Sequence, residues 1–121
     1  MTYYTQEEFI NGIKKAFKSE EFIDYWGTKA LKHLGLKLTQ KGNEMVLTIY
    51  YDTRKKEENI YEQFYISMVE VEEKDDFKYS DTFNVNTRSG ERHIQWEFDF
   101  GSTSDFVEIL QGIIYYFYSR Y

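Results

Sequence analysis

The spacing of apolar residues changes at Leu36, and this change restricts the fold more than any other feature of the sequence. Before Leu36 the apolar residues recur at steps of three and four, the period of an amphipathic helix. After it they alternate with polar residues, as in a strand with one buried and one solvated face. The helical period returns after Asp105. The sequence therefore predicts helices at both ends of the chain and antiparallel strands between them.

Local signals mark where the N-terminal helices begin. Thr5 to Glu8 match the capping box, in which a Thr and a Glu satisfy each other's backbone N–H groups. Ser19 offers a second N-cap and is followed by two glutamates, which the positive end of a helix dipole favours. We expect one helix from near Thr5 and a second that ends at Gly35. One long bent helix over residues 5–34 is the alternative.

Glycine occurs inside each of the expected N-terminal helices, at Gly12 and Gly27. Inside a helix, glycine costs about 1 kcal/mol relative to alanine. We therefore expect tertiary packing to hold both helices together at these positions.

Turn residues divide the alternating region into strands. Residues 41–43 (Lys-Gly-Asn) predict a hairpin turn between strands at 36–38 and 45–51. Further strands are expected over residues 60–71, 77–85 and 93–100. A final helix is expected to start after Ser102 and to bury a stripe made of Phe106, Leu110, Ile113 and Phe117.

The order ααβββββα predicts an α+β fold. We expect an antiparallel β-meander of about five strands, with two N-terminal helices and one C-terminal helix packed on one face. A chain of 121 residues can form one hydrophobic core and is too short for two, so residues 1–121 are expected to be a single domain.

The sequence shows no sign of export. It has no cysteine, so it offers neither disulfides nor thiolate ligands. Residues 1–8 have no basic n-region and no apolar h-region, and no stretch approaches the roughly 18 apolar residues of a membrane span. We expect a cytoplasmic protein.

No motif for catalysis, metal binding or nucleotide binding occurs in the sequence. The best candidates for such chemistry are His93, Glu97 and Asp99, because a His near carboxylates can act in acid–base catalysis or bind a metal. The alternation of a strand alone also explains why these polar residues lie on one face. His93 and Glu97 would lie about 14 Å apart along a strand, too far for a direct side-chain hydrogen bond. His33 fits the negative end of the expected second helix. We expect no enzyme activity and no cofactor.

Charge is distributed unevenly along the chain. Residues 1–41 carry a net charge of +2 and residues 42–121 a net charge of -8. The segment from Glu70 to Asp76 holds five acidic residues and one lysine. This acidic segment is either a solvated turn that discourages aggregation or a docking surface for a basic partner.

Tyrosines near the acidic segment favour the docking interpretation. Alternation places Tyr61 and Tyr65 on the face of their strand opposite Phe64 and Ile66, outside the main core. Interface hot spots are enriched in Tyr, although tyrosines at this position could equally cover a sheet edge or pack under a loop. The acidic balance of this region argues against direct binding of DNA or RNA.

In size, charge and architecture, the chain resembles the bacterial immunity proteins of contact-dependent growth inhibition and other polymorphic toxin systems. The resemblance implies tight binding to a basic nuclease toxin, with the acidic surface blocking the active site or the substrate path of the toxin. The residues expected to contact this partner are Tyr61, Glu62, Tyr65, Glu70, Glu72, Glu73, Asp75 and Asp76.

Two other functions remain open from the sequence. One is an enzyme or small-ligand binder with a cavity between the sheet and the C-terminal helix, as cystatin-like α+β folds have. The other is a phage-encoded inhibitor that imitates nucleic acid with carboxylates, as anti-CRISPR proteins often do. A net charge of -6 is modest for such a mimic.

Overall fold

The structure is a computed structural model of the chain and describes residues 4–69, 72–74, 77–80, 82–87, 93–97 and 104–120. Its helices are α1 (Gln6–Phe17), α2 (Glu20–Thr28) and α3 (Ser104–Tyr118), with a 3-10 turn η1 (Glu57–Asn59). Its strands are β1 (Tyr4–Thr5), β2 (Gly35–Lys41), β3 (Glu44–Tyr50), β4 (Ile60–Val69), β5 (Glu72–Lys74), β6 (Phe77–Ser80), β7 (Thr82–Thr87) and β8 (His93–Glu97).

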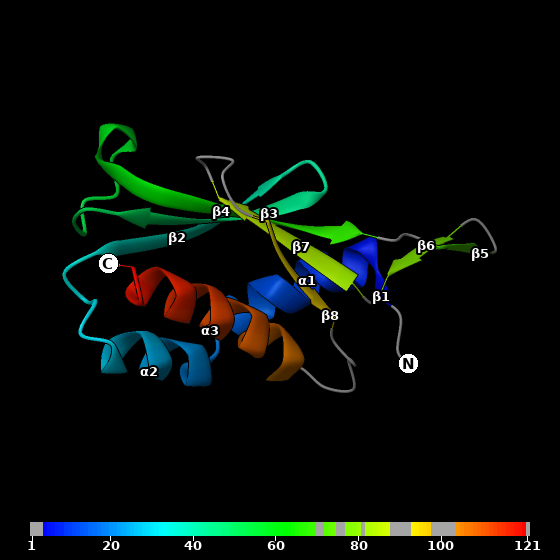
Figure 1. Ribbon diagram of the computed structural model, residues 1–121, viewed down its shortest axis with the longest axis horizontal. Coiled ribbons are helices and arrows are strands. Elements are labelled where there is room, and N and C mark those ends of the chain that lie inside the picture. The colour runs from blue at the N-terminus through cyan, green and yellow to red at the C-terminus, as the bar shows by residue number, and fades with distance from the viewer. Residues whose placement is uncertain are drawn as a thin grey trace.

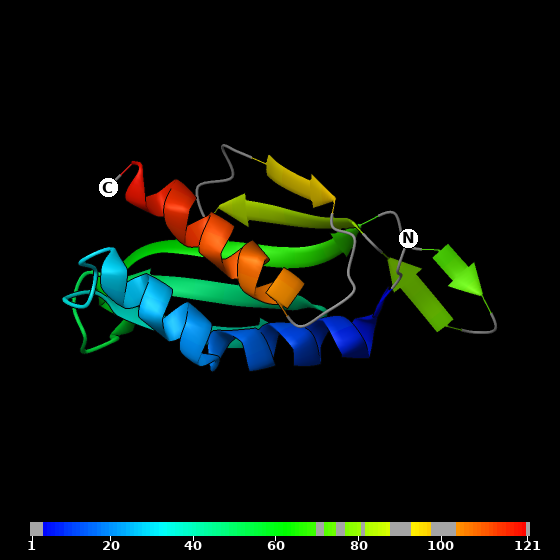
Figure 2. The same cartoon turned by 90° about the horizontal axis from the view of Figure 1, so that it is seen from below.

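A five-stranded antiparallel sheet with the order β2-β3-β4-β7-β8 forms the centre of the molecule. The helices α1, α2 and α3 all lie against one face of this sheet (Figure 1). In Figure 2, α1 and α2 follow one another along the β2 side of the sheet. α3 lies beside them and crosses the strands of the sheet. The predicted α+β fold, with its meander and its helices on one face, is confirmed.

Both N-terminal helices begin where the sequence predicts. The Oγ1 atom of Thr5 accepts a hydrogen bond from the N–H of Glu8 at 3.2 Å, and the carboxylate of Glu8 accepts one from the N–H of Thr5 at 3.0 Å. Ser19 caps α2 by accepting a hydrogen bond from the N–H of Phe22. The chain therefore forms two helices here and not one long bent helix, because Ser19 leaves the helical conformation to act as the cap.

The second helix ends earlier than expected. α2 stops at Thr28, and Ala30 adopts the left-handed conformation with a φ of 55°. Ala30 thus occupies the position directly after the helix C-cap, which was predicted for Gly35. Gly35 instead opens β2. The expected dipole role of His33 is therefore wrong, since His33 lies in the connection after α2 and not in its last turn.

The predicted hairpin forms between β2 and β3. Lys41 pairs with Glu44 across a two-residue turn in which Gly42 has a φ of 61°. Glycine at the first central position is typical of a type II′ turn, which matches the twist of the flanking strands.

One predicted strand is divided between two sheets. The alternation over residues 77–85 predicts a continuous strand, but β6 and β7 are separate elements with different partners. β7 pairs with β4 and β8 in the main sheet, whereas β6 joins β1 and β5 in a three-stranded sheet. The short strand β1 overlaps the capping box at Thr5 and has no strand signal of its own, so its pairing could not be predicted from local periodicity.

The core lies between the main sheet and the helices. The predicted stripe of α3 is confirmed as buried, and Ile109 and Ile114 of the same helix are fully buried too. Phe9 of α1 stacks on Phe83 of β7, with ring centroids 4.9 Å apart. Among the sheet residues that the structure describes, Met45, Leu47, Ile49, Phe64, Ile66 and Val85 are also fully buried.

Within the described part of the chain, the helices are too short or too polar to cross a lipid bilayer.

Candidate functional site

Residues 72–74 of the acidic segment form β5, which pairs with β6 in an antiparallel hairpin. Figure 1 shows this hairpin extending away from the main sheet, beyond the ends of the helices. Glu73 is exposed and pairs in register with Lys78, and Glu72 pairs with Tyr79. The sequence analysis treated this segment as a turn, but Glu72–Lys74 is a strand. The predicted contact residues Glu70, Asp75 and Asp76 lie outside the described residues.

The hairpin is joined to the body of the molecule through β1. Tyr4 and Thr5 pair with Ser80 and Tyr79 of β6. The ring of Tyr4 also contacts the ring of Phe106 on α3, edge to face, with centroids 5.1 Å apart. Because β1 runs directly into α1, the base of the hairpin is fixed to both the N-terminal and the C-terminal helix.

A β-bulge interrupts β4 near its start. Ile49 of β3 pairs with Glu62, whereas the next residue, Tyr50, pairs with Ile60. Tyr61 is therefore an extra residue in the pairing of β4 with β3. Such a residue interrupts the alternation of side chains between the two faces of the sheet.

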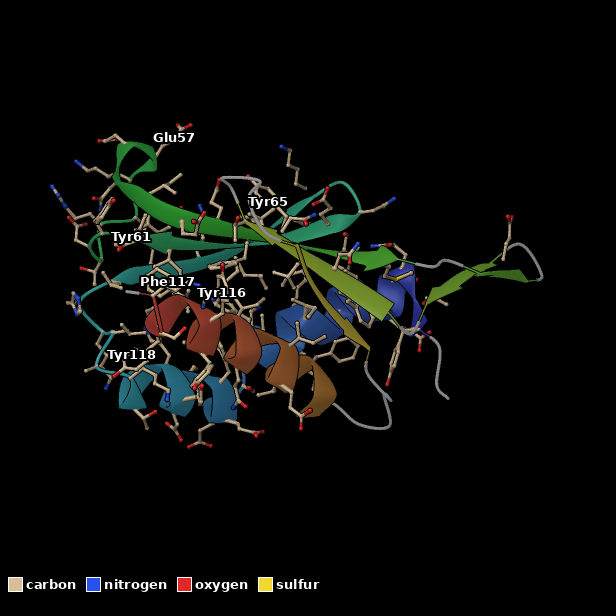
Figure 3. The ribbon with its side chains drawn as sticks, viewed as in Figure 1. Glu57, Tyr61, Tyr65, Tyr116, Phe117 and Tyr118 are labelled. Carbon is tan, nitrogen blue, oxygen red and sulfur yellow. The ribbon has the colours of Figure 1, made fainter. Side chains whose placement is uncertain are left out.

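Because of this bulge, Tyr61 packs against the helices. Its ring lies 5.2 Å from the ring of Phe117 in α3, edge to face, and 4.5 Å from the ring of Tyr51. Tyr65 lies on the opposite, helix-free face of the sheet (Figure 3). The expected position of Tyr61, outside the core beside the acidic segment, is wrong. Tyr61 stands near the start of β4, whereas the acidic hairpin follows the end of that strand.

This difference between the two tyrosines predicts different effects on stability. Tyr61→Ala should lower the free energy of unfolding by about 2 kcal/mol, because it removes ring packing against the core. Tyr65→Ala should lower it by about 1 kcal/mol, the typical worth of one partly exposed hydrogen bond. Urea unfolding of both variants measures the difference. Equal values would contradict the packing of Tyr61 against Phe117.

The helix-free face of the sheet carries a hydrogen-bonded group of polar side chains, with the ammonium of Lys41 5.9 Å from the ring centroid of Tyr65. The hydroxyl of Tyr65 donates to Oε1 of Gln63 at 3.0 Å, and Nε2 of Gln63 donates to Oγ1 of Thr48 at 3.1 Å. Thr48 is buried, as are Val46 and Tyr50 on the same face of β3. The expectation of a fully wet outer face is therefore wrong for β3, where Gln63 of the neighbouring strand bonds to the buried Thr48.

Glu62 is half-buried and close to the bulge. Its carboxylate accepts a hydrogen bond from the N–H of Gln63 at 3.0 Å. Of the predicted contact residues, Tyr61, Glu62 and Tyr65 thus belong to the main sheet, and Glu72 and Glu73 to the hairpin. The structure does not bring these two groups together.

A cluster of tyrosines around one lysine lies on the outer surface of the helices. The Nζ atom of Lys29 is 5.1 Å from the ring centroid of Tyr25, 5.7 Å from that of Tyr115 and 5.3 Å from that of Tyr118. Tyr115 and Tyr118 are exposed, and such cation–π contacts hold their rings in place. The sequence analysis missed this cluster because it combines residues of α2 and α3.

An apolar groove of about 500 Å³ lies where the α1–α2 junction meets the start of β2. Its apolar lining residues are Phe17, Phe22, Ile23, Trp26 and Leu36. Lys18 and Lys55 complete the lining. The predicted cavity would lie between the sheet and the C-terminal helix, whereas this groove is lined by residues of α1, α2, β2 and two connecting loops and by no residue of α3.

The loop that carries Lys55 is held by an ion pair. The guanidinium of Arg54 contacts the carboxylate of Asp52 at 2.6 Å, and the backbone N–H of Arg54 donates to the same carboxylate at 2.9 Å. The side-chain hydrogen bond from Arg54, followed by the backbone one, lowers the pKa of Asp52 from 3.8 to about 2. The pair is exposed and adds little to stability, but it fixes the path of the loop.

The residues considered for catalysis form no site that the structure describes. His93 and Glu97 are at opposite ends of β8, the edge strand, and Asp99 lies outside the described residues. Among the residues that are described, no group of three or more His, Asp or Glu side chains could hold a metal ion.

Comparison with known proteins gives no relative. No protein-family model, no curated protein and no solved structure matches this chain.

Proposed function

We propose that this chain is a non-enzymatic binding protein that acts in the cytoplasm as an immunity protein. It neutralises a cognate basic nuclease toxin by placing the acidic β5–β6 hairpin in the cleft where the toxin binds nucleic acid. The carboxylates of the hairpin pair there with lysines and arginines that would otherwise contact phosphates.

The observation that carries this proposal is the position of the acidic segment. A net charge of -4 over residues 70–76 is attached to a hairpin that extends from the body of the molecule (Figure 1). A projecting element can enter a concave site that a flat sheet face cannot reach. The base of the hairpin is fixed by β1, which limits the ordering entropy lost on binding.

The structure offers less support for the other two functions. The space between the main sheet and α3 is filled by buried side chains, among them Ile109, Leu110 and Ile113. A nucleic-acid mimic needs carboxylates spread along a surface, whereas Thr48, Gln63 and Tyr65 on the helix-free face are uncharged and the charge next to them is the cation of Lys41.

Co-expression with the product of the adjacent open reading frame tests the proposal. We expect the two proteins to copurify and the toxicity of the neighbour to disappear. A neighbour that is neither toxic nor bound would contradict the immunity function.

Removal of charge from the hairpin should slow association with that toxin. The test variant changes Glu72→Gln, Glu73→Gln, Asp75→Asn and Asp76→Asn. Neutral side chains are preferable to lysines, because a lysine at position 73 would face Lys78 across the ladder. We expect association to be about tenfold slower at low salt, because steering is lost, and the difference to shrink as salt rises. The melting temperature should hardly change.

A control variant removes the same number of charges elsewhere, at exposed positions of α2, η1 and α3. It changes Asp24→Asn, Glu57→Gln, Glu58→Gln and Glu108→Gln. Its association rate, measured by stopped flow, should stay close to that of the wild type. If the control lost binding and the hairpin variant did not, the interface would lie away from the hairpin.

A further inference from the structure

We propose that the groove at the α1–α2 junction binds a free anionic amphiphile, with its apolar tail in the groove and its acidic head group between Lys18 and Lys55. The ligand class is an alkyl carboxylate or a chemically similar monomeric anion. This inference rests on the groove alone and is independent of the proposed function.

The wall of the groove is suited to an alkyl tail. Phe22 is almost fully buried and lies in ring contact with Phe17, with centroids 5.7 Å apart. Trp26 and Leu36 are half-buried beside them. Ile23 is 56% exposed. Covering this apolar side chain with an alkyl tail would therefore contribute favourable free energy to binding. A volume of about 500 Å³ with a mostly apolar lining is typical of small-ligand sites.

The charges at the groove select an anion. Lys18 and Lys55 are the charged residues of the lining, and neither forms an ion pair with any residue that the structure describes. Both lysines are exposed, and their two ammonium groups give the rim of the apolar groove a positive charge that attracts a carboxylate. Residues 1–41, which supply all of the lining except Lys55, have a net charge of +2, although the whole chain is acidic.

The backbone at Lys55, which lines the groove, is in a strained conformation. Lys55 has a φ of 57°, a conformation that residues other than glycine rarely adopt. A Cβ atom on Gly35 would lie 2.6 Å from the carbonyl oxygen of Asp52 and 3.0 Å from Cγ of Lys55. The loop can therefore approach β2 only because residue 35 is glycine. Strained positions that the surrounding structure enforces are often found at ligand sites.

Decanoate, kept below the concentration at which it forms micelles, is the probe. Trp26 lines the groove and the chain has one other tryptophan, so two indole N–H signals are expected in an NMR spectrum. Trp26→Phe assigns them. We expect decanoate to shift the Trp26 signal in a saturable manner and decyltrimethylammonium, which has a cationic head group, to shift it far less.

The double variant Lys18→Gln and Lys55→Gln should bind decanoate at least about tenfold more weakly, because both charge-assisted contacts of the carboxylate are lost. The control Lys14→Gln and Lys15→Gln removes the same charge from exposed positions of α1 outside the groove and should bind like the wild type. Lys55→Gly separates binding from folding, because glycine tolerates the positive φ: it should weaken binding without lowering the melting temperature.

Three results would overturn the inference. The first is the absence of a saturable shift with decanoate. The second is equal affinity for decanoate in the two lysine variants. The third is a response to vesicles of phosphatidylglycerol without any response to monomeric decanoate, because the groove would then be a membrane contact and not a site for a free ligand.

Discussion

Phe83→Ala is expected to lower the free energy of unfolding by about 3–5 kcal/mol, the usual cost of removing a buried aromatic ring from a core. Phe83 is fully buried near the start of β7, and its ring stacks on Phe9 of α1 at 4.9 Å with an interplanar angle of 19°. Its neighbours in register are Met68 and Trp96. The ring thus packs between the main sheet and the helical layer. Neither layer can move to fill the cavity that the substitution leaves without losing its contact with the other layer.

A loss of this size is a large share of the 5–15 kcal/mol that stabilises a typical domain. Urea unfolding monitored by circular dichroism measures it. Tyr115→Ala is the matched control, since it removes an aromatic ring that is 60% exposed, and its effect should stay within about 0.5 kcal/mol. If the Phe83 variant lost less than about 1 kcal/mol, the contact between α1 and β7 would not be part of the core.

The parts of the fold that the sequence predicts are those with local causes. Thr5 and Ser19 cap helices because each has an oxygen that reaches an orphan N–H group three residues later. Gly42 forms a turn because the position needs a positive φ. The buried stripe of α3 follows from its period alone. None of these inferences requires knowledge of a distant partner.

The parts that could not be predicted depend on residues far apart in the sequence. The bulge at Tyr61 moves its side chain to the helix-covered face of the sheet. The alternation of residues within a strand does not indicate where such an extra residue occurs. β6 leaves the main sheet because it pairs with β1, which is about 75 residues earlier in the chain. Ala30 takes the left-handed conformation that the sequence analysis gave to Gly35, because a single residue at a helix end can accept this strain.

The candidate sites show the same division. The charge of the acidic segment is visible in the sequence, whereas its place on a projecting hairpin is visible only in the structure. The groove joins Leu36 and Lys55 to residues of α1 and α2, and no spacing in the sequence indicates that these segments meet. The hairpin and the groove belong to opposite ends of the molecule, so variants at the two sites should have additive effects on stability.

The same substitution should have opposite effects at two helical glycines, because α3 contacts α1 at Gly12 and does not contact Gly27. A Cβ atom on Gly12 would lie 2.5–2.8 Å from three carbons of the Phe106 ring. Phe106 is itself buried and held against Tyr4, so its ring cannot turn away freely. Gly12→Ala should lower the free energy of unfolding by about 2 kcal/mol, although alanine is the better helix former.

Gly27→Ala should instead raise the free energy of unfolding, by about 0.5–1 kcal/mol. A Cβ atom there would meet only the end of the Lys32 side chain, at 3.0 Å, and that flexible end can move aside. The alanine then contributes its higher helix propensity and reduces the entropy of the unfolded chain. Urea unfolding of both variants should therefore give values that differ by about 3 kcal/mol, the sum of an overpacked contact and a gain in helix propensity. If both variants were stabilised, Phe106 would not rest on Gly12, and the close approach of α3 to α1 that fixes the base of the acidic hairpin would have to be abandoned.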